Sequence, residues 1–217
     1  MSAVATTDGA TTNGATTDGR VLKGNETRRL VLGRAMRIAS VEGLAALSLG
    51  RLASELELSK SGVFALFGSK EELQLATVRA ASRVYHDQVI APALDRPEGL
   101  ARLWALAESW LAYSRTRVFP GGCFFYAVGA EFDAQPGRVR DALAEGSRTW
   151  HGLIADQLAA ARAAGELDAD EDVEQLGFEV VAVMEYANAL SLLHDDDAPY
   201  DRARTALRRL LGAAPTD

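Results

Sequence analysis

The segment from Ser48 to Leu73 constrains the fold more than any other part of this chain, because it combines helix caps, a tight turn and regular apolar spacing within a short stretch. Spacing of i, i+3, i+4 and i+7 predicts a first short helix, at Leu49, Leu52, Ala53 and Leu56. Ser48 is suited to cap this helix, and Glu57 then begins a turn. The segment therefore starts as a helix followed by a sharp change of direction.

A second short helix is predicted over residues 60–67, with Ser59 as its cap and Gly68 as its end. Helical spacing turns Val63 and Phe67 toward the inside of the protein. The side chains left facing outward are Lys60, Ser61 and Phe64.

A third helix is predicted from Ser69 to about Val89, because Ser69 and Glu72 have the spacing of a capping box. Two helices joined at a steep angle by a short turn can present the N-terminal end of the second helix to the major groove of DNA. Lys60 and Ser61 lie at that end. Spacing alone also fits three ordinary helices of an all-α protein, so the DNA interpretation depends on the residues themselves.

These residues resemble the DNA-binding segment of TetR-type transcriptional regulators. The likeness runs through Ser48-Leu49-Gly50-Arg51-Leu52-Ala53 and residues 58–73, and it extends upstream through Arg34-Ala35 to Glu42-Gly43-Leu44. It implies an all-α protein with an N-terminal three-helix helix-turn-helix DNA-binding module, followed by a larger helical bundle for dimerisation and ligand sensing. The DNA-binding positions that it implies are Ser48, Arg51, Ser59, Lys60, Ser61, Gly62, Phe64 and Lys70.

Two residues depart from the family pattern. Phe64 stands where a phosphate-binding tyrosine is common, and Leu66 stands where a histidine is frequent. Since phosphate contacts fix register and carry no sequence information, their loss would weaken DNA binding more than redirect it, and Lys60 and Arg51 could compensate. The departures keep one alternative open: a helical protein-interaction adaptor with a degenerate helix-turn-helix.

Charge is distributed unevenly along the chain, whose formal net charge is −7. Residues 20–90 hold eleven Lys and Arg against seven Asp and Glu, whereas residues 91–217 hold twelve against twenty-one. A net negative protein can still bind DNA when its positive charge is clustered, because the field acts over one Debye length, ~8–10 Å in salt. The N-terminal excess is modest and decides nothing by itself.

The rest of the composition favours a cytoplasmic all-α protein. Nearly half of the residues are apolar, and six prolines in 217 residues leave long helical runs unbroken. A single Cys excludes an intramolecular disulfide and suits a reducing compartment. We expect no membrane partner and no signal peptide, because apolar runs stay short of the ~20 residues of a membrane span and the N-terminus lacks a basic start and an apolar block.

Three pentapeptides of the form Ala-Thr-Thr-Asp/Asn-Gly fill residues 5–19. With no large apolar side chain beyond Val4 they cannot offset their ordering entropy, so residues 1–20 are expected to form a disordered tail. The expected divisions after the tail are a helix-turn-helix domain at 21–68, a connecting helix at 69–90 and a regulatory and dimerisation domain at 91–217.

The last part of the chain predicts further helices, at about 100–117, after Gly122, and at 139–164, 173–193 and 200–211. In TetR-like proteins the last two long helices of each subunit form a four-helix interface, so the resemblance implies a two-fold homodimer. The apolar faces of these helices could instead pack inside one subunit. The interface residues expected are Val183, Ala187, Leu190, Leu207 and Leu211.

Large side chains gather in the middle of the predicted bundle and suggest a pocket for a small apolar or aromatic effector of unknown identity. An aromatic residue at helical spacing is more often part of a core than of a pocket, and this holds at each position. A second stretch, from Gly121-Gly122-Cys123-Phe124-Phe125 to Val139-Arg140, resembles the regulatory domain of one TetR subgroup and names no effector. The expected pocket residues are Trp104, Trp110, Tyr113, Phe125, Trp150, His151, Met184 and Asn188, with Glu131 and His194 as further polar anchors.

An enzyme is the alternative from another class, with Cys123 as nucleophile and His151 or His194 as base. Nothing in their spacing supports it, and the paired glycines and phenylalanines around Cys123 favour a buried, inert thiol. The three histidines also lack metal-ligand spacing. We therefore expect no catalytic residue, no metal and no cofactor; the resemblance implies a dimeric regulator, a repressor that an effector releases from an inverted repeat in double-stranded DNA.

Overall fold

Helices form the framework of this protein. A computed structural model describes residues 14–212, with side chains from residue 24, and no strand occurs in that range. The α-helices are α1 (Gly14–Glu42), α2 (Leu49–Glu55), α3 (Lys60–Phe67), α4 (Lys70–Tyr85), α5 (Leu100–Arg115), α6 (Phe124–Phe132), α7 (Arg138–Ala163), α8 (Val173–His194) and α9 (Ala198–Leu211). Two 3₁₀ turns, η1 (Leu44–Ala46) and η3 (Ala91–Ala93), and a π turn, η2 (His86–Ile90), lie between them. The all-α prediction is confirmed.

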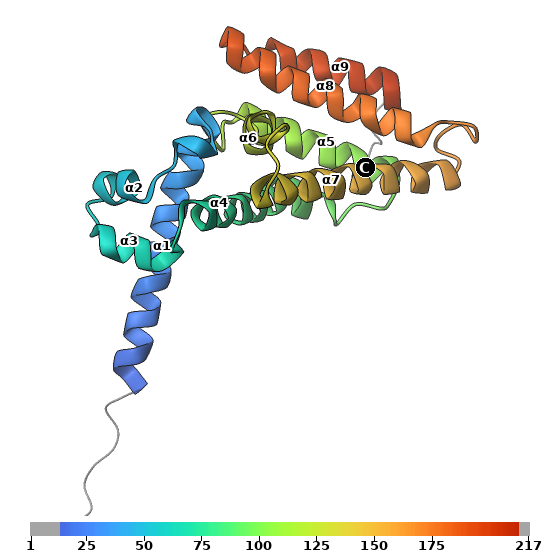
Figure 1. Ribbon diagram of the computed structural model, residues 1–217. Helices are drawn as coiled ribbons and strands as arrows, with labels where there is room; N and C mark the ends of the chain where they lie inside the picture. Colours follow the sequence, from blue (N-terminus) through green and yellow to red (C-terminus); the bar gives the residue numbers. More distant parts are fainter. Residues whose placement is uncertain (1–13, 213–217) are drawn as a thin grey trace, which may run out of the picture.

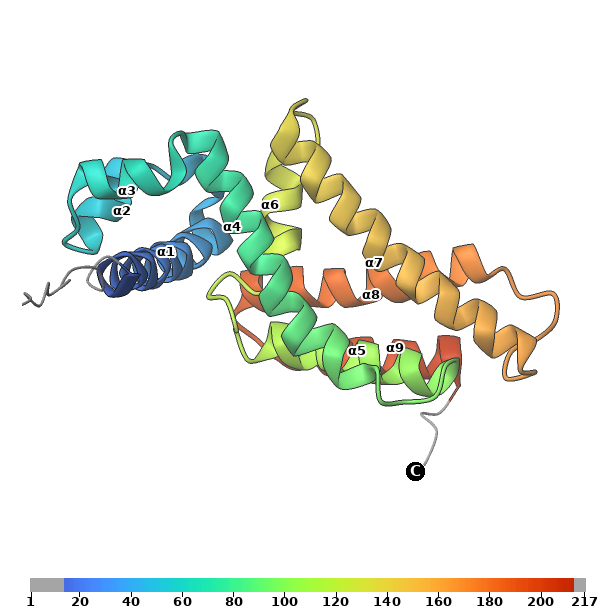
Figure 2. The same cartoon turned by 90° about the horizontal axis from the view of Figure 1, so that it is seen from below.

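The helices form a small group and a larger one (Figures 1 and 2). Helices α1, α2 and α3 make up one end of the molecule, and α4 runs from this end into the larger group of α5 to α9. Within the larger group α8 and α9 lie side by side, and α6 contacts both α1 and α7. The predicted order of a three-helix module, a connecting helix and a larger bundle is observed.

Serine caps begin α2, α3 and α4, as predicted. The hydroxyl oxygens of Ser48, Ser59 and Ser69 accept hydrogen bonds of 3.1 Å from the backbone N–H groups of Arg51, Gly62 and Glu72, respectively. Each cap satisfies one of the N–H groups that a helix leaves unpaired in its first turn. Gly68 ends α3 with a φ of +74°, which a residue with a Cβ adopts only with strain. The two short helices are therefore bounded by local signals.

The reciprocal hydrogen bond of the predicted capping box, in which the Ser69 N–H would donate to the Glu72 side chain, does not form, so this part of the prediction is wrong. The Glu72 carboxylate accepts a hydrogen bond from Arg138 Nη1 of α7, 2.7 Å away, and the Ser69 N–H donates to the Phe67 carbonyl instead. A guanidinium is a stronger partner for a carboxylate than a neutral backbone N–H, which explains the exchange. Glu72 thus connects α4 to the bundle.

Residues 1–13 of the tail predicted over residues 1–20 lie outside the described residues. Residues 14–20 belong to the first turns of α1, so the tail prediction is wrong for them. Once the packed part of α1 has formed a helix, each residue added at its end gains one backbone hydrogen bond without a new nucleation step. Helix α1 therefore begins before the residue at which the first domain was expected to start.

Helix α8 is apolar on two sides. Its length and composition would also suit a membrane span, with a mean hydropathy of 1.4 over its most apolar window. One side, which includes Val180 and Met184, is buried in the bundle, and 44% of that window is buried. The opposite side leaves Phe178, Tyr186 and Leu193 between 64 and 79% exposed. The buried side belongs to the protein core, and the other is an apolar surface.

Candidate functional site

Helix α3 has a buried side and a solvent-exposed side. Val63 and Phe67 are buried in the core of the small module, at 0 and 6% exposure. Burial of side chains of this size is worth roughly 1.5–3 kcal/mol each, which holds α3 in place. The exposed side carries Lys60, Ser61, Gly62 and Phe64, so the orientation predicted from the spacing is confirmed.

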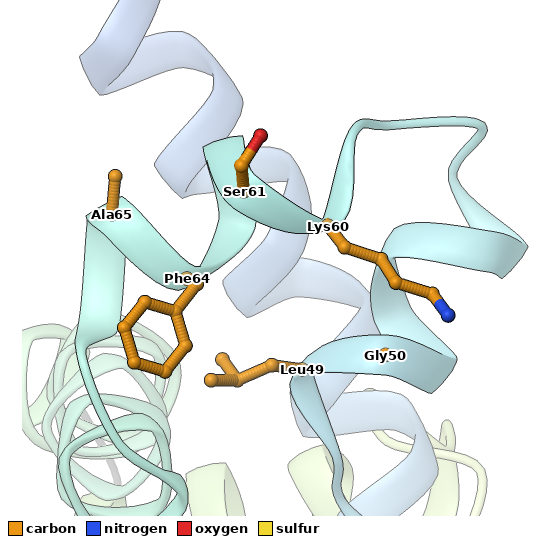
Figure 3. Close-up of a pocket in the computed structure, with 6 residues that line it drawn as sticks. All are labelled: Leu49, Gly50, Lys60, Ser61, Phe64 and Ala65. Atoms are coloured by element: carbon orange, nitrogen blue, oxygen red, sulfur yellow. The ribbon is translucent and has the colours of Figure 1, made fainter.

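A shallow hollow of about 440 Å³ opens between α2 and α3 on this exposed side (Figure 3). Figure 3 shows the Phe64 ring and the Leu49 side chain pointing toward one another, while the Lys60 side chain extends beside Gly50. The lining residues are Leu49, Gly50, Lys60, Ser61, Phe64 and Ala65. The surface at the start of α3 is therefore apolar in its middle and carries an ammonium and a hydroxyl beside it.

Arg51, predicted to help bind DNA, forms ion pairs with carboxylates of its own chain. Its guanidinium donates two hydrogen bonds of 2.7 Å to Glu42 and one of 2.8 Å to Glu55, and Arg34 donates to Glu55 at 2.6 Å. Hydrogen bonding to Glu42 raises the pKa of Arg51, and hydrogen bonding to Arg51 lowers the pKa of Glu42 and of Glu55. These ion pairs connect α1 to α2 and orient the helix-turn-helix.

Lys70, predicted to bind phosphate, lies at the start of α4 and is exposed. Its Nζ donates a hydrogen bond to the backbone carbonyl of Ala45, and Gln74 donates one of 3.0 Å to the carbonyl of Leu44. Both carbonyls belong to η1. Because an ammonium has three N–H donors, Lys70 keeps donors that could bind a phosphate.

The N–H groups of the same turn are bound by the larger group of helices. The Glu131 carboxylate of α6 accepts hydrogen bonds of 2.7 Å from the N–H groups of both Leu44 and Ala45. Gly43 lies against this carboxylate, since a Cβ at Gly43 would be 2.6 Å from Glu131 Oε2. Glu131 therefore joins the two groups of helices. Its role as an effector anchor stays a prediction.

A second close contact lies beside Glu131. The Gly121 N–H donates a hydrogen bond of 3.2 Å to the hydroxyl of Ser40, near the end of α1. A Cβ at Gly121 would lie only 1.7 Å from the Ser40 carbonyl oxygen, so only glycine permits this approach. The end of α1 is thus packed directly against the bundle.

The aromatic residues predicted to line a pocket meet around Tyr85, which the prediction missed. The Tyr85 ring lies edge to face with those of Tyr113, Phe125 and Trp150, at centroid distances of 5.4–5.6 Å. Trp110 is hydrogen-bonded to the Tyr85 side chain. Burial raises the pKa of Tyr85 and of Tyr113, so both phenols stay neutral. Tyr85 is the last residue of α4, so the helix that starts beside η1 ends in this aromatic cluster.

Asn188 is the predicted polar anchor that lies deepest in the bundle. It is fully buried on α8, as is Met184. Its Oδ1 accepts hydrogen bonds from the Ser114 hydroxyl (2.7 Å) and the Cys123 N–H (3.0 Å), while its Nδ2 has no hydrogen-bond partner within residues 24–212. Asn188 therefore offers a buried donor.

The other predicted pocket residues include both buried and exposed side chains. Trp104 is buried in α5, and its Nε1 also lacks a partner among the described side chains. His151 is exposed on α7, with Nδ1 2.8 Å from the Ser147 carbonyl, and His194 is exposed at the end of α8. Glu185, on the partly buried side of α8, was not predicted, and burial raises its pKa. The histidines lie at the surface of the subunit.

Cys123 is fully enclosed, as the residues around it predicted. Burial raises the pKa of its thiol to about 12, so the nucleophilic thiolate is suppressed at neutral pH. Among the described residues no group of His, Cys, Asp and Glu is arranged to hold a metal ion.

Part of the predicted dimer interface is buried inside the subunit. Leu207, Leu211 and Ala187 are only 0, 3 and 4% exposed, because α9 covers one side of α8, so their assignment to an interface is wrong. Val183 and Leu190 are partly exposed. The most exposed apolar side chains of α8, Phe178, Tyr186 and Leu193, are spaced eight and seven residues apart and lie on one stripe of the helix. The eight-residue spacing of Phe178 and Tyr186 was the signal in the sequence that could have identified these two residues.

Comparisons with known proteins agree with these two groups of helices. Residues 31–77 match the family model for bacterial regulatory proteins of the tetR family, and residues 99–207 match the model for the tetracyclin repressor-like C-terminal domain. A comparison with curated protein sequences finds no match.

Solved structures share the fold. A TetR transcriptional regulator from Chloroflexus aurantiacus J-10-FL is 24% identical, with a TM-score of 0.79 over 86% of this chain and 94% of that one. A TetR-family regulator from Cytophaga hutchinsonii is 22% identical, with a TM-score of 0.73 over 90% of this chain and 98% of that one. AibR, solved in complex with isovaleryl coenzyme A and operator DNA, is 15% identical, with a TM-score of 0.69 over 85% of this chain and 98% of that one.

Proposed function

Because this chain belongs to the TetR family of bacterial regulatory proteins, we propose that it is a cytoplasmic, dimeric DNA-binding repressor that a small apolar or aromatic effector releases from an inverted-repeat operator. The observation that carries the proposal is the geometry of α3. Its cap and its buried side fix the helix, and its exposed N-terminal half presents Lys60 and Ser61 to solvent. This is the arrangement with which a recognition helix enters a major groove.

Dimerisation would use the exposed stripe of α8. Phe178, Tyr186 and Leu193 would be covered by the same residues of a second copy, since a two-fold axis brings identical surfaces together. The two copies of α3 would then enter major grooves about 34–36 Å apart, or a small multiple of this distance. The binding of operator DNA by AibR, a protein of the same fold, supports this assignment.

Release by an effector would act through α4. This helix starts at Lys70, which holds η1, and ends at Tyr85 in the aromatic cluster. A ligand that inserted beside Tyr85 would shift the end of α4, and with it the position of α3 relative to its partner. A coupling free energy of ~1–3 kcal/mol would change operator occupancy by about 5–150-fold.

Fluorescence anisotropy with the purified protein tests DNA binding. The probes are a duplex from upstream of the coding region, duplexes selected from a random pool and a scrambled duplex, each at two salt concentrations. We expect selective binding that weakens steeply with salt, and Lys60→Ala should weaken it by about tenfold or more without changing the dimer. The control Arg208→Ala removes an exposed cation from α9 and should leave the affinity unchanged.

Two outcomes would contradict the proposal. Equal affinity of Lys60→Ala and the parent protein would refute the assignment of α3. Weak binding to every duplex, with no sequence recovered from the random pool, would favour the adaptor alternative, for which the apolar hollow beside Phe64 is the supporting observation.

A further inference from the structure

Phe64 is an exposed aromatic side chain at the centre of the surface that we assign to DNA. It is 58% exposed, although burial of a phenylalanine side chain is favourable and an exposed one commonly marks a binding surface. Its ring and the Leu49 side chain face each other across the hollow between α2 and α3 (Figure 3). Ala65 is also one of the lining residues. Because a phenyl ring has no hydrogen-bond donor, Phe64 cannot bind a phosphate oxygen as a tyrosine would.

The chemistry of this hollow limits what it can receive from DNA. In the major groove the base edges present polar donors and acceptors, and the 5-methyl group of thymine is the apolar feature that projects there. A carbon-lined hollow is complementary to that methyl group and would leave a polar base atom unpaired. The occupant that it fits is therefore thymine.

The residues beside the hollow favour nucleic acid over an apolar peptide. Lys60 and Ser61 are among the six residues that line it, and none of the six is acidic. A cation and a hydroxyl next to an apolar hollow can pair with a phosphate or a base edge while the methyl group is enclosed. A helical peptide would be matched better by a longer apolar groove.

We propose that the hollow formed by Leu49, Phe64 and Ala65 receives the 5-methyl group of one thymine in each operator half-site, so that Phe64 reads sequence. This inference rests on the proposed function. It replaces a phosphate contact, which carries no sequence information, by a base contact, which does. Phe64 is then a specificity-determining residue of the recognition helix.

The test uses duplexes selected from a random pool with the full-length protein. Each thymine in the selected half-sites is replaced in turn by deoxyuridine, which removes only the 5-methyl group. At one position per half-site we expect about a fourfold loss of affinity, the effect of no longer burying one methyl group. Replacement in both half-sites together should give about fifteenfold, because the two contacts are independent.

Two variants connect that loss to Phe64. Phe64→Ala should bind the thymine and deoxyuridine duplexes equally, because the wall of the hollow is gone. Phe64→Tyr keeps the ring and should keep the sensitivity to the methyl group. Since Phe64 is exposed, both variants should fold, which circular dichroism and thermal melting check.

The outcomes separate this inference from the proposed function. If no sequence is selected from the pool, both are overturned. If an operator is selected but deoxyuridine weakens binding equally for the parent and Phe64→Ala, or for neither, only the thymine assignment is overturned. A uniform loss for Phe64→Ala on every duplex would indicate a contact to the sugar-phosphate backbone and would also overturn it.

Discussion

The Glu131 carboxylate of the bundle lies 2.7 Å from the backbone nitrogen of Leu44, the first residue of the turn that follows α1. The same carboxylate accepts a second hydrogen bond from Ala45, while Lys70 and Gln74 of α4 donate to the carbonyls of the turn. The N–H groups of η1 are thus held by α6 and its carbonyls by α4. This short turn is the place where the DNA-binding module, the connecting helix and the bundle meet.

Replacement of Glu131 by Gln should weaken this junction. The amide keeps one acceptor and loses the charge that strengthens both hydrogen bonds, so we expect the free energy of unfolding to fall by about 1–3 kcal/mol in urea. The amides of Leu44 and Ala45 should also exchange hydrogen faster. Glu145→Gln, on the exposed side of α7, is the control and should change neither measurement. Unchanged exchange at Leu44 in Glu131→Gln would show that the carboxylate does not hold the turn.

The glycine at 121 should tolerate no side chain. A Cβ would lie 1.7 Å from the Ser40 carbonyl oxygen, so Gly121→Ala must move the backbone of α1 or of the loop before α6. We expect a loss of about 1–3 kcal/mol or more, measured by thermal unfolding. Gly146→Ala, in α7 with open space around it, should instead stabilise the protein by about 0.5–1 kcal/mol. Similar melting temperatures for the two variants would contradict the close contact.

The exposed stripe of α8 should determine the oligomeric state. Tyr186 is 65% exposed, and Tyr186→Asp would place a charge where two apolar stripes are proposed to meet. We expect monomers in sedimentation velocity at concentrations at which the parent protein is dimeric. Leu94→Asp, which alters another exposed apolar residue outside α8, should remain dimeric. A dimeric mass for Tyr186→Asp would exclude this stripe as the interface.

Cys123 should react slowly while the protein is folded. Its pKa of about 12 leaves a thiolate fraction at pH 8 that is about three orders of magnitude below that of an unfolded chain, so iodoacetamide should label the thiol only after denaturation. The raised pKa also gives a pH dependence: stability from the buried thiol is present below its ordinary pKa, near 8.5, and is lost as the pH rises toward 12. Cys123→Ala should therefore lose less stability than the parent over that range. Rapid labelling of the folded protein would overturn the assignment of a buried, inert thiol.

Features that depend on neighbouring residues in the chain were predictable. The caps at Ser48, Ser59 and Ser69 and the stop at Gly68 involve partners within four residues, so the pattern of side chains determines them. The exposed side of α3 follows in the same way from helical spacing. The positions of Lys60 and Phe64 on the exposed side of α3 could therefore be predicted before the bundle was known.

Features that depend on distant residues were not predictable. Arg34 reaches Glu55 across 21 positions, and Glu131 finds its partners 87 and 86 positions away. Leu207 looked like an interface residue because an apolar helix face does not reveal whether its own subunit covers it. Such outcomes depend on tertiary packing, which spacing along one helix does not encode.

Lys70 lies where the proposed DNA contact and the junction with the bundle meet. One N–H of its ammonium group is bound to the Ala45 carbonyl, and a DNA phosphate would take another, so phosphate and Glu131 would act on opposite sides of the same three-residue turn. Binding linkage is reciprocal: the free energy by which a bound effector weakens operator binding equals the free energy by which bound operator weakens effector binding. An effector would accordingly bind more tightly to the free protein than to the protein on its operator.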